Sequence, residues 1–127
     1  MSLVQIAYQT ILTKIRDHQS MSRAQLLEVF QQASSLMGSP FRSALSLFEK
    51  HPETITITDY QLYYLIQVGM EKVMVFKSHS RARLNDCSCK KSWARKVGEK
   101  APLMCMHQVV LELALTVFKG EIMIKQA

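Results

Sequence analysis

Cys87-Ser88-Cys89 and Cys105-Met106-His107 decide the fold, as two one-spaced pairs with fifteen residues between them. These pairs hold all three cysteines of the chain and one of its four histidines. Three thiolates and one imidazole make a Cys3His set, which suits tetrahedral zinc and leaves no coordination position open for chemistry. We therefore expect one structural zinc ion, bound by Cys87, Cys89, Cys105 and His107.

The one-residue spacing indicates that each pair lies at a bend or at the end of an element, where a metal would hold the backbone in place. The alternative is three buried thiols, or two of them joined in a disulfide. An odd number of cysteines in a chain without an export signal argues against a disulfide framework.

The composition is that of one folded domain. Of the 127 residues, 48% are apolar and 20% are charged, and no apolar run approaches the length of a membrane span. The stretch from Met1 to Lys14 lacks the charged start and the cleavage site of a secretory signal peptide. Reduced thiols without such a signal point to the cytosol or the nucleus.

Hydrophobic periodicity predicts a helical N-terminal part over residues 1–52, with helices at 3–16, 23–36 and from Ser39 to Pro52. Ser22 and Gln25 form a capping-box pattern at the start of the second helix, and Gly38 suits its end. We expect Ser39 to cap the third helix, with a proline at its favoured first position.

The period then changes from helical to two, which predicts strands at 54–58, 62–68, 72–76 and, delivering the first ligand pair, 84–89. Gly69-Met70-Glu71 is expected to be a short hairpin loop. Residues 53–120 thus combine a β-hairpin with a zinc finger that ends in a helix, and the predicted fold class is α+β. We expect residues 121–127 to be a frayed tail.

The last predicted helix, from Met106 to Lys119, is apolar over a wide arc and has only a narrow polar stripe. Such a helix is either covered on most sides within its own domain or meets a partner. If it meets a partner, the interface candidates are Val109, Leu113, Val117 and Phe118.

The net charge of +6 gathers around the predicted metal site. Residues 71–100 hold nine basic and three acidic residues, whereas the rest of the chain holds seven of each. Contacts of such a region with DNA phosphates would depend on salt and be independent of base sequence. The alternative is a solvated surface that only keeps the protein soluble. The candidate phosphate contacts are Arg81, Arg83, Lys90, Lys91, Arg95, Lys96 and Lys100.

The C-x-C and C-x-H pairs, with a hairpin before them and a helix after them, resemble the SWIM zinc finger. The small size and the helical N-terminal part make the chain similar to the SWIM-domain subunits of the Shu complex, over roughly residues 25 to 118. Trp93 stands where that family often has an aromatic residue. The family motif has an alanine three residues after its histidine, whereas this chain has Val110.

The resemblance implies a nuclear subunit that is not an enzyme. Members of the family pair with a RecA-like recombinase paralogue, and they help a recombinase filament to assemble or persist on single-stranded DNA during homologous recombination. The implied partners are therefore that paralogue and, alone or beside it, single-stranded DNA. We expect neither a membrane nor a small-molecule substrate.

Three other functions compete with this one. A protein-interaction adaptor would have no nucleic-acid role. A zinc-finger regulator that reads DNA sequence needs polar side chains on a recognition helix, and the helix after His107 is too apolar for that. A zinc hydrolase needs an open coordination position beside a general base, and four protein ligands leave none.

Overall fold

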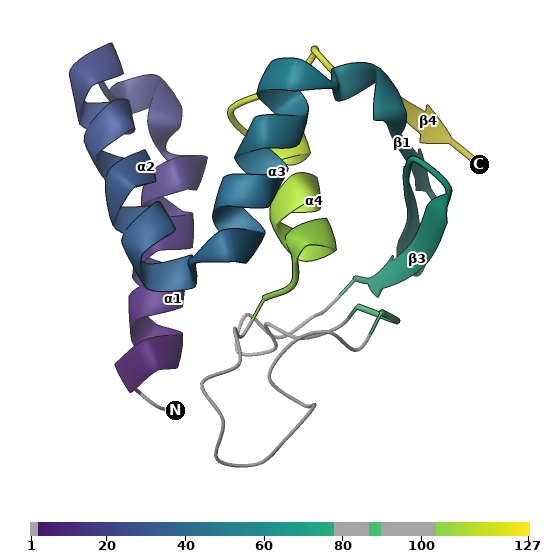
Figure 1. Ribbon diagram of the computed structural model, residues 1–127, viewed down its shortest axis with the longest axis horizontal. Helices are drawn as coiled ribbons and strands as arrows, with labels where there is room; N and C mark the ends of the chain where they lie inside the picture. Colours follow the sequence, from purple (N-terminus) through teal and green to yellow (C-terminus); the bar gives the residue numbers. More distant parts are fainter. Residues whose placement is uncertain (1–2, 78–86, 90–103) are drawn as a thin grey trace.

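The computed structural model of the chain describes residues 3–77, 87–89 and 104–127 (Figure 1). These residues confirm the α+β class: three N-terminal helices lead into a small sheet, and one further helix, α4, lies between α3 and that sheet. Within these ranges, no helix has the length and apolar character that crossing a membrane requires.

The N-terminal helices form where capping and periodicity predict them, with bounds α1 Leu3–Arg16, α2 Arg23–Met37 and α3 Ser39–Lys50. The Ser22 hydroxyl accepts from the Gln25 amide, and Gln25 Oε1 accepts from the Ser22 amide at 2.8 Å, so the capping box is confirmed. Ser39 does not cap α3, as expected, but is its first residue. Gly38, with φ of 75°, ends α2 and precedes α3 directly, a backbone conformation that favours glycine.

The sheet has the order β3-β2-β1-β4, in which β1, β2 and β3 are antiparallel neighbours. Their bounds are β1 Ile55–Asp59, β2 Tyr63–Val68 and β3 Glu71–Phe76. The hairpin loop is one residue shorter than predicted. Glu71 belongs to β3 and pairs with Val68, because Gly69, with φ of 60°, allows a turn of only two residues.

The C-terminal segment differs from its prediction in two ways. Helix α4, Met106–Leu115, ends before Lys119. The last residues are not frayed, because β4, Ile124–Gln126, pairs in parallel with β1 and Ile122 is only 7% exposed. The chain turns back at Gly120, with φ of 95°, so that an apolar side chain enters the core and the backbone groups of the tail find partners.

Helix α4 is the centre of the core and not a partner surface. It packs against α3 and β3, and Val109 and Leu113 are buried among the side chains of this domain. The prediction of these two residues as interface candidates is therefore wrong: the wide apolar arc is covered from within the domain. Val117 and Phe118 are half-buried, and the Phe118 ring stacks on Phe48 with centroids 4.5 Å apart.

Candidate metal centre

The first ligand pair is attached to the edge of β3. Cys87 forms an isolated antiparallel bridge with Val75. Ser88 bonds Met74 twice: its amide donates to the Met74 carbonyl, and its hydroxyl accepts from the Met74 amide, both at 2.9 Å. The turn that carries Cys87 and Cys89 thus occupies backbone groups that an edge strand would leave unpaired. Of the strand predicted at 84–89, only residues 87–89 lie within the described part of the chain.

The second ligand pair begins α4. Cys105 is the N-cap residue and forms a capping box with Gln108, whose Oε1 accepts from the Cys105 amide at 3.1 Å. His107 lies in the first helical turn and is 2% exposed. Gln108 was assigned only to the polar stripe of the helix; in the structure it is buried and fixes the backbone of a ligand.

The structure brings all four predicted ligands together. The three sulfurs and one ring nitrogen lie within 4.8 Å of one another, and none of the cysteines is in a disulfide. His107 Nδ1 is 3.9 Å from Cys87 Sγ and 3.8 Å from Cys105 Sγ. Ordinary bond lengths to tetrahedral zinc place a sulfur and a nitrogen about 3.6 Å apart. The cluster is therefore a few tenths of an ångström wider than an occupied zinc site and is compatible with one metal ion.

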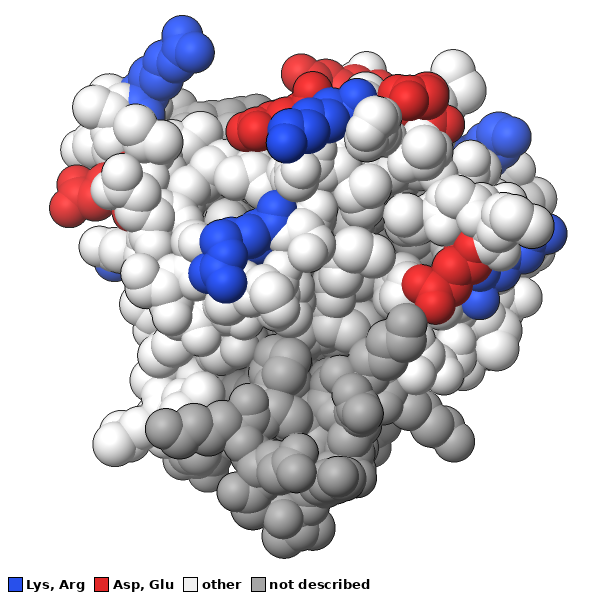
Figure 2. All heavy atoms as spheres, in the orientation of Figure 1, with Lys and Arg blue, Asp and Glu red and all other residues white. Residues whose placement is uncertain are grey.

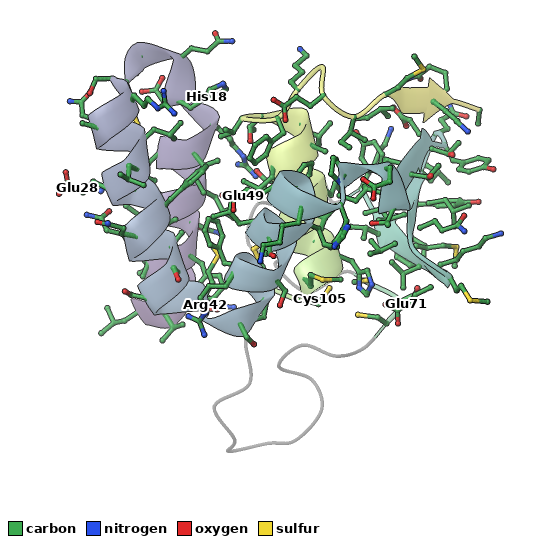
Figure 3. The ribbon with its side chains drawn as sticks, turned by 45° about the horizontal axis from the view of Figure 1, so that its top comes forward. His18, Glu28, Arg42, Glu49, Glu71 and Cys105 are labelled. Atoms are coloured by element: carbon green, nitrogen blue, oxygen red, sulfur yellow. The ribbon has the colours of Figure 1, made fainter. Side chains whose placement is uncertain are left out.

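Glu71 is a residue of this site that the sequence reading missed. Its Oε1 lies 2.6 Å from His107 Nε2, and Figure 3 shows Glu71 and Cys105 at the same end of the fold, on β3 and at the start of α4. A carboxylate accepts hydrogen bonds, so Nε2 carries a hydrogen and Nδ1 turns its lone pair toward the sulfurs. No spacing pattern links positions 71 and 107. Only the register of the hairpin, which places Glu71 first in β3, could have suggested the contact.

The protons of the metal-free site are shared between neighbours. A hydrogen bond from Cys87 lowers the pKa of the Cys105 thiol, although burial acts in the opposite direction. The same bond, together with burial, raises the pKa of Cys87. Burial disfavours a charged His107, but its bonds to Cys105 and Glu71 outweigh this and raise its pKa. A buried thiolate beside basic and acidic protons is a site in which a divalent cation can replace protons.

The predicted phosphate contacts cannot be placed. All seven, and Trp93 with them, lie outside the described residues. The described residues hold nine basic and eight acidic side chains, so five of the six net positive charges belong to the rest of the chain. Figure 2 shows basic and acidic side chains interspersed over one face of the described part, with no continuous basic patch there.

No known protein family, no curated protein and no solved structure matches this chain. Its function is inferred from its own residues.

Proposed function

We propose that this protein is a non-enzymatic scaffold subunit stabilised by one structural zinc ion. The observation that carries the proposal is the approach of Cys87, Cys89, Cys105 and His107 to within 4.8 Å, from two parts of the chain. Three thiolates with one imidazole favour zinc over the harder magnesium or calcium ions. A four-ligand site leaves no position for a substrate or an activated water.

The four ligands would couple zinc binding to folding. Cys87 and Cys89 are attached to the edge of β3 through Ser88, Cys105 and His107 begin the central helix α4, and Glu71 adds the hairpin. Because such a site does not exist in the unfolded chain, binding free energy becomes folding free energy, about 10–16 kcal/mol in zinc-finger peptides.

We further propose that the scaffold acts in a Shu-type complex in the nucleus. There it pairs with a RecA-like recombinase paralogue and promotes assembly or stability of a recombinase filament on single-stranded DNA in homologous recombination. The support is the similarity of the two ligand pairs to the SWIM motif, together with a hairpin before them and a helix after them. Because Val109 and Leu113 are buried, the partner surface must lie elsewhere than on α4.

The test is co-purification of the tagged chain with its partner, read out by mass spectrometry for a protein of the RecA-like ATPase fold. Cys105→Ser and His107→Ala should abolish the pairing, because each loosens the start of α4. Met70→Ala, which trims a side chain that is 99% exposed in the hairpin turn, is the matched control and should pair normally. Normal pairing by either ligand variant would show that the scaffold proposal is wrong.

A pure protein-interaction adaptor is the second candidate. The near balance of charge among the described residues favours it, since phosphate binding usually needs a basic surface. The two candidates differ in the binding of single-stranded DNA by the purified pair. Binding that weakens steeply as salt increases supports the recombination role, whereas binding that is absent or independent of salt supports the adaptor.

A further inference from the structure

The sheet has one face that no described helix covers. Side chains alternate between the two faces of a strand, and the buried row of Ile57, Ile66 and Val73 identifies the face that meets the helices. Leu65 and Met74, which pair with each other, lie on the opposite face, and Met74 is 36% exposed. In Figure 3 the side chains of this outer face point away from the helices.

Three aromatic rings lie in a row at one end of the outer face. Tyr63 and Phe76 are cross-strand partners with ring centroids 6.1 Å apart, and Phe76 is 48% exposed. The ring of Tyr60 stacks on Tyr63, with centroids 5.0 Å apart and planes 16° apart. The row therefore offers flat apolar surfaces to solvent, edged by two phenol hydroxyls.

The charged side chains of the outer face are all cations. The pairing register places Lys72 opposite Gln67 and Lys125 opposite Thr58, at outward positions, and both lysines are exposed. The carboxylates of these strands, Asp59 and Glu71, occupy inward positions, where Asp59 binds Lys77 at 2.6 Å and Glu71 binds His107. Among the described strand residues, the outer face has no acidic side chain.

We propose that this outer face binds single-stranded nucleic acid, with bases stacked on Phe76, Tyr63 and Tyr60 and phosphates near Lys72 and Lys125. Ring faces accept any base, and ammonium groups attract the backbone, so the combination suits a strand without sequence preference. A protein partner fits less well, because lysine is depleted in protein–protein interfaces. The chain's net charge of +6 also favours a polyanion. The inference rests on the nucleic-acid part of the proposed function and gives it a surface.

The experiment uses the zinc-loaded full chain and a fluorescently labelled oligo-dT strand, with affinity measured by anisotropy at several salt concentrations. Phe76→Leu and Tyr63→Leu keep an apolar side chain but remove a ring, and each should weaken binding about 10-fold or more. Replacing both Lys72 and Lys125 by Gln should reduce the slope of log affinity against log salt by roughly one.

Leu62→Ala is the matched control, since it trims a neighbouring apolar side chain that is 72% exposed and has no ring. Its affinity should match that of the wild type. Equal losses in Leu62→Ala and Phe76→Leu would contradict base stacking. Wild-type protein that does not bind the strand, or ring variants that bind it normally, would overturn the surface and leave the face to a protein partner. Zinc content, measured on the same samples, tests the scaffold independently of these outcomes.

Discussion

His107 uses its two ring nitrogens for different purposes. Nδ1 faces two cysteine sulfurs at 3.8 and 3.9 Å, while Nε2 lies 2.6 Å from the Glu71 carboxylate. The ring is almost fully buried, whereas the Glu71 side chain is 44% exposed, so the contact joins a buried ligand to the surface of the hairpin. Such a partner fixes the ring's orientation and increases its basicity as a ligand.

Replacing Glu71 should therefore weaken metal binding without removing a ligand. Glu71→Gln keeps the size of the side chain but loses its charge, and we expect zinc affinity to fall about 10-fold, within the usual range of about 10- to 100-fold for such partners. Competition with a chromogenic chelator measures this affinity. The control is Lys72→Gln, one residue further on the opposite face of the strand. Equal affinities for Glu71→Gln and wild type would show that Glu71 does not position the ring.

The pKa shifts give the direction in which pH acts on the site. Thiolates and a neutral imidazole bind zinc, so protons compete with the metal. The Cys105 pKa is lowered, which lets its thiolate persist further into acid than an ordinary thiol, whereas the raised pKa of His107 lets a proton return to the ring sooner. We expect zinc to be released as pH falls, with uptake of more than one proton per metal, in a titration followed by a zinc indicator. His51→Gln, which changes an exposed histidine, should not alter the profile. Release on raising the pH would contradict this ligand set.

At the scale of elements, local patterns predicted what local interactions determine. The N-terminal helices were found because capping residues and apolar spacing act within a few residues of each other. Strand β4 was missed because its three residues gain their stability from β1, at positions more than sixty residues earlier in the chain. The burial of α4 was left open for the same reason: a sequence pattern shows that an arc is apolar, but not what covers it.

The C-terminal segment should contribute measurably to stability. Ile122 is 7% exposed and joins the core, so Ile122→Ala should lower the free energy of unfolding by about 2–3 kcal/mol through lost burial and a cavity. Met123→Ala is the matched control, because Met123 is 81% exposed and its loss should change stability by less than about 0.5 kcal/mol. Urea unfolding of the two variants compares them directly. Similar stabilities would mean that the tail does not hold the fold in solution.

At the scale of the whole molecule, the candidate site joins the sheet to the central helix. The sequence was sufficient to predict the four ligands, because sulfur and imidazole in one-spaced pairs are rare outside metal sites. It was not sufficient for Glu71 and Gln108, which act through a hairpin register and a helix cap. The salt bridge between Arg16 and Glu112, at 2.6 Å, links α1 to the same helix, so α4 is tied to both halves of the fold.

The central claim is that one zinc ion, held by Cys87, Cys89, Cys105 and His107, stabilises the fold. The most direct measurement combines metal analysis of the purified protein with calorimetric melts before and after chelation. We predict about one zinc per chain, and loss of the cooperative transition when the metal is removed. Metal-free protein that keeps the same cooperative transition at the same temperature would contradict the claim.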